Sequence, residues 1–366
     1  MRTRRGAANL SLLGALLTLA ATAVAAWARL GSRGAYARTY QWINLPTATS
    51  GPTQFQGFGI DISLTIDHAG LAALVAVLTI AIGAAVWLRR GGRGEPGYVR
   101  NYVVLSLLVL GAVGVCVSGD LAELAAFWGV TAVATYLGLS QRWGVTDSTG
   151  PARWALAVPM VADVALVLAI GIVYSRYGQL TLSALPPVLH TIPGWGLKSL
   201  TAAAGLILVA AAGRGALFPL QGWLTWTRDA PACGQALAQG VWPVLSALLI
   251  YRTLPLFHGA GPQALMALGV VGVVAGIVLP LRALAGNDVR DALFGAGAGQ
   301  LGLVLVVFAK GAAVVALTAA LAGGLARGAA LLAAGGLIAA MRTTDLSSMG
   351  DAMRRMPLSA LALALA

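Results

Sequence analysis

The sequence predicts an all-α fold, a polytopic transmembrane helical bundle of about ten or eleven helices. Hydrophobic residues make up 58% of the 366 residues and charged residues only 10%, whereas roughly a quarter of an ordinary globular chain is charged. Apolar runs long enough to cross a hydrocarbon core of ~30 Å recur along the whole chain. These runs are continuous and lack the alternation of β-barrel strands, so helices are expected.

Ten predicted spans follow from the apolar runs, near residues 10–28, 68–88, 101–118, 121–139, 154–174, 199–213, 234–254, 264–284, 292–309 and 311–340. An eleventh run starts at Pro357 and reaches the last residue, Ala366, so we expect the sequence to end inside a helix. Residues 311–340 exceed the ~20 residues that a span needs, which predicts one long tilted helix or a broken one.

Basic residues give the chain a net charge of +12, but they are spread over the short segments between spans. With the N-terminus in the cytoplasm, sixteen of the 24 Lys and Arg residues fall on inner segments, seven on outer segments and Arg327 within a span. This asymmetry favours a multi-pass protein of a bacterial-type inner (cell) membrane with a cytoplasmic N-terminus. It also explains the positive charge without a nucleic-acid partner, and the partner expected from composition is the lipid bilayer.

The chain is predicted to have two regions, an N-terminal anchor helix with an outward loop (1–66) and a transmembrane domain (67–366). The loop covers residues 29–66, the longest stretch outside the spans. A second interpretation of the first helix stays open, because basic residues ahead of its apolar run also fit a cleaved secretory signal. Those residues are Arg2, Arg4 and Arg5.

Ionisable residues inside the spans or at a helix break are the candidate site residues, because a charge at the bilayer centre costs ~2.5–3.5 kcal/mol on insertion scales. They are Asp120, Glu123, Asp163, Arg214, Asp229 and Arg327.

Each candidate also has a structural interpretation. Asp120 and Glu123 lie about one turn apart at the start of a span, which favours interfacial carboxylates near a helix N-terminus. Asp163 follows Pro159 and fits a proton site and a structural partner for a helix break equally well. For Arg327, a cation that is paired with a carboxylate or that snorkels to the membrane surface is favoured over a role in transport.

Histidine and cysteine give no further site. His68, His190 and His258 fall at span ends or in predicted loops, so none is predicted to be a relay histidine or a haem ligand. Cys116 and Cys233 lie far apart and away from any CxxC pattern, so no disulfide, iron–sulfur or zinc site is predicted.

The segment 214–236, RGALFPLQGWLTWTRDAPACGQA, is the most unusual in the chain. An apolar helix ends at its start, Pro219 breaks the pattern, and a new helix begins after Pro231. A discontinuous helix with a charge beside the break is a recurrent way of placing a polar site in a transporter. An interfacial loop with a tryptophan belt is the alternative, and composition does not choose between them.

Several ordered motifs resemble one family, the antiporter-like proton-translocating membrane subunits of NADH–quinone oxidoreductase, especially subunit L. The same family includes subunits of multisubunit cation/proton antiporters and of inorganic-carbon uptake complexes. The resemblance runs from about Phe58 to the end. It rests on FGIDISLTIDHAG (58–70, with Asp67), the stretches 121–143 and 163–180, RGALFPLQGWL (214–224), GNDVRDALFGAGAGQLG (286–302) and TTDLSSMGDAMRRMPL (343–358).

The resemblance implies a proton relay in which a glutamate modulates a lysine on a broken helix. In this sequence the glutamate position falls on Gly129, the lysine on Arg214 and the next relay histidine on Gln239. The later lysine and histidine fall near Arg327 and Gly323. Because arginine cannot be deprotonated at usable pH, we expect the half-channel to be impaired or rerouted through Asp163, Glu123 and Asp229.

The function implied by the resemblance is that of a membrane subunit of a proton-translocating NADH–quinone oxidoreductase-type complex, contributing to or scaffolding proton translocation. No cofactor is expected in this chain, and quinone, NADH, flavin and iron–sulfur clusters would belong to partner subunits. Two alternatives stay open. One is a membrane subunit of an inorganic-carbon (bicarbonate or CO2) uptake complex, and the other is a divergent, non-transporting scaffold.

Overall fold

The computed structural model describes most of the chain, and every structural statement below refers to this part. The described residues are 2–29, 31, 35–45, 58–91, 97–140, 149–178, 180–183, 197–228, 230–350, 354 and 356–365. The α-helices are α1 (Arg2–Ala28), α2 (His68–Gly91), α3 (Tyr98–Val117), α4 (Leu121–Leu139), α5 (Thr149–Tyr177), α7 (Leu197–Arg214), α8 (Gly222–Trp226), α9 (Ala232–Gly259), α10 (Pro262–Leu284), α11 (Val289–Ala309), α12 (Ala313–Met341) and α14 (Pro357–Leu365).

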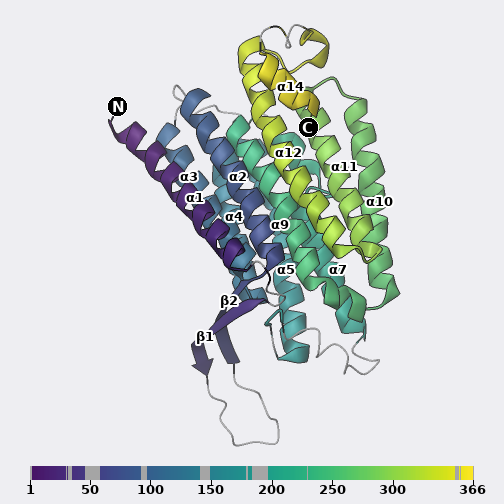
Figure 1. Ribbon diagram of the computed structural model, residues 1–366. Helices are drawn as coiled ribbons and strands as arrows, with labels where there is room; N and C mark the ends of the chain where they lie inside the picture. The colour runs from purple at the N-terminus through teal and green to yellow at the C-terminus, as the bar shows by residue number, and fades with distance from the viewer. Residues whose placement is uncertain are drawn as a thin grey trace, which may run out of the picture.

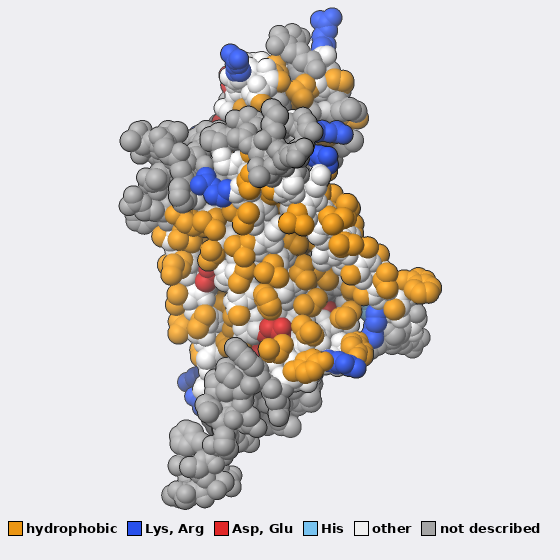
Figure 2. Space-filling model, turned by 90° about the vertical axis from the view of Figure 1, so that its left-hand side faces the viewer, with side chains coloured by type: hydrophobic (Ala, Val, Ile, Leu, Met, Phe, Trp, Pro, Cys, Tyr) orange, Lys and Arg blue, Asp and Glu red, His pale blue; other side chains and the backbone are white. Residues whose placement is uncertain are grey.

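The long helices lie side by side in a single bundle, with both chain ends at the end of the bundle opposite a small β-hairpin (Figure 1). Within the described residues, nine helices are long and apolar enough to cross a membrane, namely α1 to α5 and α9 to α12. Hydrophobic side chains cover the middle of the molecule in Figure 2, and Lys and Arg lie towards its two ends. The predicted polytopic all-α bundle is therefore confirmed.

The predicted outward loop 29–66 is more ordered than expected, because it contains the two-stranded antiparallel sheet of β1 (Tyr36–Leu45) and β2 (Phe58–Ile66). Strict alternation of apolar and polar residues along 60–66, IDISLTI, is the sequence signal for a strand that we missed. The backbone N–H of Gly119 donates to the carbonyl of Ser63 (2.6 Å), which ties the hairpin to the turn between α3 and α4.

The run predicted at 311–340 as one long or one broken helix forms a single continuous helix, α12, of 29 residues. It ends at Met341, and the C-cap residue Arg342 adopts a left-handed backbone conformation (φ 55°). The short 3-10 helix Leu346–Ser348 follows, with the Asp345 side chain accepting from the Ser347 N–H as its N-cap.

Helix α9 is the core of the bundle, because its spanning segment is wholly enclosed by other helices. It packs against α2, α7 and α12 over much of its length, and it also contacts α4 and α11. Two prolines, Pro243 and Pro255, lie inside α9, where a helix surrounded by protein tolerates the missing backbone donors. The residues that line the candidate site all lie close to this helix.

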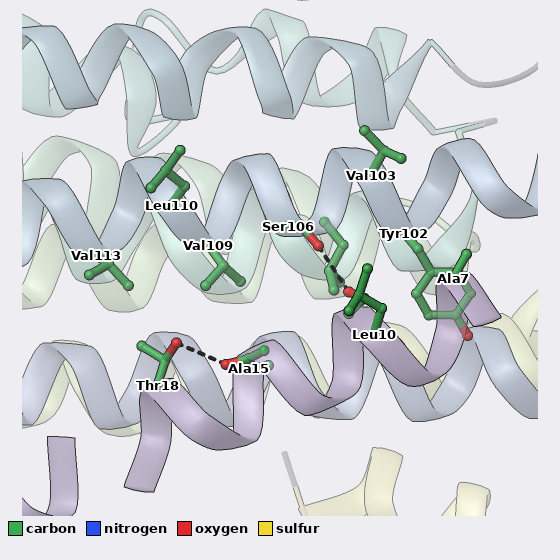
Figure 3. Close-up of a pocket in the computed structure, with 13 residues that line it drawn as sticks. Ala7, Leu10, Ala15, Thr18, Tyr102, Val103, Ser106, Val109, Leu110 and Val113 are labelled. Carbon is green, nitrogen blue, oxygen red and sulfur yellow. Dashed lines mark hydrogen bonds between the residues drawn. The ribbon is translucent and has the colours of Figure 1, made fainter. Parts of the chain in front are cut away.

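Helix α1 lies at the edge of the bundle and leaves a groove against α3, which Figure 3 shows in close-up. The groove has a volume of about 450 Å³ and is lined mainly by apolar and small side chains. One hydrogen bond between hydroxyls, Ser11 Oγ to Ser106 Oγ (3.1 Å), crosses from α1 to α3. Only 17% of the spanning window of α1 is buried, so most of its surface lies outside the packed bundle.

Helices α10 and α11 approach so closely that only glycine fits at their contact. A Cβ on Gly272 would lie 2.6 Å from the carbonyl oxygen of Gly302, and a Cβ on Gly302 would lie 2.6 Å from that of Gly272. Small residues of this kind let helix backbones pack in lipid, where no hydrophobic effect pulls helices together.

We expect Gly272→Ala to destabilise the protein by about 1–3 kcal/mol, because the added methyl group overpacks the α10–α11 contact. Thermal unfolding in detergent measures the change. Gly171→Ala on α5 is the matched control, since a Cβ at that position meets nothing within 4 Å. Equal melting temperatures for the two variants would contradict the close contact.

Candidate functional site at the broken helix

The predicted discontinuity of the helix near Pro219 is confirmed. Helix α7 ends at Arg214, the short helix α8 follows, and α9 begins at Ala232. Proline lacks an amide hydrogen and cannot continue a hydrogen-bond ladder, and the carbonyl groups freed at the end of α7 find other donors. The indole Nε1–H of Trp223 donates to the carbonyl of Gly213 (2.9 Å), and the Leu217 N–H donates to that of Ala212 (2.8 Å).

The last residue of α7 forms a two-point ion pair with α5. Arg214 Nε donates to Asp163 Oδ1 (2.9 Å), and Arg214 Nη2 donates to Asp163 Oδ2. The Arg214 residue is only 3% exposed. The Asp163 side chain is half-buried, and a bidentate guanidinium–carboxylate contact is the geometry that best offsets the hydration lost by the buried arginine.

Two tryptophans enclose this ion pair. Trp128 on α4 donates its indole N–H to Asp163 Oδ1 (2.9 Å), and the Arg214 guanidinium lies over the ring of Trp242 on α9, 4.7 Å from its centroid. The two rings meet edge to face with centroids 4.8 Å apart, and Trp242 in turn donates to Thr135 Oγ1 (2.9 Å). Four helices therefore converge on one charge pair through hydrogen bonds, stacking and cation–π contact.

The paired groups are chemically suited to hold charge. A guanidinium keeps its proton at any usable pH, and protonation of Asp163 would break the bidentate contact and leave Arg214 without its counter-ion. The arrangement supports the structural interpretation of Asp163, a partner for the charge at the helix break.

Arg327 on α12 fits neither structural interpretation that the sequence favoured, a paired cation or a snorkelling one. It is only 7% exposed, so it does not snorkel to the surface, and among the described residues it has no ion pair and its buried Nε has no hydrogen-bond partner. Its side chain lies directly against Gly297 of α11, where a Cβ would clash with the guanidinium. A glycine on the neighbouring helix thus makes room for an arginine.

Several predicted positions line one small cavity. Its lining includes Arg214, Gln239 and Arg327, together with Phe294 and Ala298 of α11, and its volume is about 10 Å³. Gln239 is only 5% exposed. The structure thereby brings the family's lysine position, its histidine position and the later arginine to one place.

Other predicted positions lie elsewhere. Gly129 follows Trp128 on α4, but a Cβ there would meet nothing within 4 Å, so this position is apart from the charge pair. Gly323 accommodates the amide of Gln300. Asp229 lies outside the described residues, as does His190.

The carboxylates at the start of α4 have different environments. Asp120 is the N-cap of α4, accepting from the Ala122 N–H (2.7 Å), so this carboxylate lies at a helix N-terminus as predicted. Glu123 lies in the first turn, beside the backbone of Ser63 and Gly119, and its Oε2 is buried with no hydrogen-bond partner among the described residues.

A second ion pair was missed in the sequence. Arg252 on α9 bonds to Asp67 Oδ1 (3.2 Å) and donates to the carbonyls of Val115 (2.9 Å) and Ser118 (2.8 Å). It lies at the edge of a cavity of about 470 Å³ that His258 also lines. The available signal in the sequence was Arg252 itself, a charged residue in the apolar run 234–254. Nothing in the sequence linked it to Asp67, which lies 185 residues earlier.

Cys116 and Cys233 are both buried, and no disulfide joins them. His68 is the first residue of α2 and His258 lies in the last turn of α9, so these two are at helix ends as predicted. Across the ranges that the structure covers, no three His, Cys, Asp or Glu side chains group as metal ligands would.

Comparisons with known proteins agree with this architecture. A model of the family described as "NADH:quinone oxidoreductase/Mrp antiporter, TM" matches residues 118–366. The "Probable inorganic carbon transporter subunit DabB1" of Halothiobacillus neapolitanus is 29% identical over 77% of this chain and 51% of its own length. The "NADH-quinone oxidoreductase subunit L" of Neisseria meningitidis is 23% identical over 97% of this chain and 53% of its own.

Among solved structures, a chain of the archaeal membrane-bound sulfane sulfur reductase complex has the same fold, with a TM-score of 0.74 at 18% identity over 99% of this chain and 74% of that one. The chain spans about half the length of the two curated relatives described here.

We expect Asp163→Asn to cost roughly 3–5 kcal/mol of stability, because it leaves the Arg214 guanidinium buried without its counter-ion. The double variant Asp163→Asn/Arg214→Gln should lose less than the sum of the two single variants. Unfolding in detergent, analysed as a double-mutant cycle, measures this coupling.

The control is Arg228→Gln. This substitution breaks the Arg228–Asp291 pair (2.9 Å), in which the arginine side chain is 42% exposed, and should cost only about 0–1 kcal/mol. Additive losses in the Asp163 and Arg214 variants would contradict a coupled pair.

Proposed function

We propose, from the premise that the chain belongs to the NADH:quinone oxidoreductase/Mrp antiporter transmembrane family, that it is a membrane subunit of a proton-translocating complex of the NADH–quinone oxidoreductase type. The observation that carries the proposal is the ion pair between buried Arg214 and half-buried Asp163 at a broken helix. The family model covers this site, and a charge beside a broken helix is a recurrent way of building the polar frame of a transporter, here with the pair as a fixed part of the frame and not as the proton carrier.

The proposal gives the redox chemistry to partner subunits. These partners would hold quinone, NADH, flavin and iron–sulfur clusters, and this chain would contribute the transmembrane helices through which or beside which protons move. The named relatives support the presence of partner subunits in general, since a subunit L and a sulfane sulfur reductase chain each belong to a larger complex.

Within this chain, the proposed proton route avoids position 214. Arg214 cannot release its proton, and Asp163 is held by both Arg214 and Trp128. Glu123 keeps a buried carboxylate oxygen without a partner among the described residues, so its protonation would break no ion pair. We assign the remaining titratable role to Glu123, with Asp229 as a further candidate.

The proposed orientation places the N-terminus in the cytoplasm. Sixteen of the 24 basic residues then face inward, and the hairpin of β1 and β2 faces outward, at the end of the bundle opposite both chain ends (Figure 1).

Proton flux into proteoliposomes that contain the purified complex tests the proposed route. We expect Glu123→Gln to lower the flux per assembled complex at least about tenfold, a typical scale for loss of a proton-transferring group. Asp163→Asn should act mainly by lowering the amount of assembled complex. Flux that ignores both substitutions would contradict a route through this chain's carboxylates, and absence of flux in the wild type would favour the scaffold.

One observation favours a second candidate function, the uptake of inorganic carbon. The DabB1 protein is 29% identical to this chain, a higher identity than that of the subunit L relative. In this case the chain would be the membrane half of a bicarbonate or CO2 uptake complex, and its soluble partner would be a large zinc protein.

Affinity purification of the tagged chain from its native membrane separates the two functions. We expect subunits of a quinone-reducing complex to co-purify with it, because the chain has the fold of a subunit of such complexes. Metal analysis and mass spectrometry of the eluate identify the partners. A stoichiometric soluble zinc protein, without quinone-reducing subunits, would establish the second function in place of the first.

A further inference from the structure

We propose that the groove between α1 and α3 binds one anionic phospholipid, with an acyl chain in the groove and the headgroup at the end of the bundle where the N-terminus lies. The proposed site goes beyond the proposed function and does not depend on which complex contains the chain. It rests on the length and width of the groove, on the pairing of its polar groups and on the charge at its end.

The groove extends along one leaflet of the membrane. Its lining residues lie between Ala7 and Thr18 on α1 and between Tyr102 and Val113 on α3. Each stretch is roughly 16 Å long at a rise of 1.5 Å per residue, and half of a hydrocarbon core of ~30 Å is about 15 Å. The spanning segments of the two helices begin at Gly6 and Tyr98, so the groove starts near the membrane surface and reaches the middle of the bilayer.

The groove is too narrow for a helix and wide enough for one hydrocarbon chain. A volume of about 450 Å³ over this length gives a mean cross-section of roughly 30 Å², whereas a helix about 10 Å across needs roughly 80 Å². A carbon chain advances about 1.2 Å per bond, so ~13 carbons extend along the groove. At about 30 Å³ each, the share of one water molecule in the liquid, these carbons fill roughly 390 Å³. One acyl chain therefore matches the groove in length and in volume.

The polar groups in the wall of the groove already have partners. Ser11 on α1 and Ser106 on α3 bond to each other (3.1 Å), and the hydroxyls of Thr18 and Tyr102 donate to backbone carbonyls (2.9 and 3.1 Å) (Figure 3). The rest of the lining consists of Leu, Val and Ala side chains and one glycine, Gly14. Water in this groove would gain few hydrogen bonds, whereas a hydrocarbon chain has none to lose.

Positive charge surrounds the end of the groove at which the headgroup would lie. Helices α1, α2 and α3 pack against one another, and none of them contains Asp or Glu. On this side of the bundle they carry six basic residues, namely Arg2, Arg4 and Arg5 at the start of α1, Arg89 and Arg90 at the end of α2, and Arg100 in the first turn of α3. Basic clusters at the membrane surface attract anionic lipid headgroups, so the charge favours an anionic over a zwitterionic phospholipid.

Native mass spectrometry of the purified full chain tests the proposal, with dioleoyl phosphatidylglycerol and dioleoyl phosphatidylcholine titrated separately. We expect one phosphatidylglycerol to bind at least about tenfold more tightly than phosphatidylcholine. In Gly14→Leu its dissociation constant should rise at least about tenfold, because the new side chain displaces two or more methylene groups from the groove. A Cβ on Gly14 meets nothing within 4 Å, so the leucine has room without displacing protein atoms.

Each variant has a matched control. Gly171→Leu on α5 adds the same side chain outside the groove, where a Cβ also meets nothing within 4 Å. Arg4→Gln/Arg5→Gln should lower the preference for phosphatidylglycerol at least about fivefold, whereas Lys198→Gln/Lys310→Gln, which removes the same charge from exposed residues elsewhere in the bundle, should leave it unchanged. Equal affinities in Gly14→Leu and Gly171→Leu, or a preference that ignores Arg4 and Arg5, would overturn the proposal.

Cryo-electron microscopy of the wild-type complex in its native lipids gives a second measurement that needs no variant to fold. We expect one elongated density between α1 and α3, continuing into a headgroup beside the first turn of α1. A protein helix of a partner subunit in this place, or a groove without lipid density, would overturn the proposal.

Discussion

In a bundle whose solvent is lipid, a charge in the interior is costly unless a counter-charge lies beside it, and the Asp163–Arg214 pair is where this constraint organises the structure. The pair joins α5 to the last residue of α7, at the point where the helix breaks. Trp128 and Trp242 then bring α4 and α9 to the same place. The break, the tryptophans and the core helix are thereby parts of one arrangement around a single ion pair.

Much of this could be predicted because apolar run length and proline position are local in sequence. The long helices and the break near Pro219 follow from such local signals. The partner of Arg214 lies 51 residues away and that of Arg252 185 residues away, and sequence spacing says nothing about either pairing. The hairpin was missed for a different reason, since its alternation lies in a stretch that composition marks only as outside the membrane.

The candidate site also shows how family positions can change together. An arginine in place of the family's lysine gives a charge that no longer titrates, and the structure surrounds that charge with a fixed carboxylate and two aromatic rings. Gln239 stands in the histidine's place on the same small cavity as Arg327. Only the packing of α11 explains how Arg327 is accommodated, because the space comes from Gly297, 30 positions earlier in the chain.

The enclosure of α9 sets an order for biosynthesis. This helix buries polar side chains, among them Gln235, Gln239 and Thr253, and α12 covers part of its surface. Since α12 begins at Ala313, a nascent chain still short of that residue presents this part of α9 to lipid or to the insertion machinery. Burial of the core is therefore completed only after roughly the last 50 residues of this sequence have begun to enter the membrane.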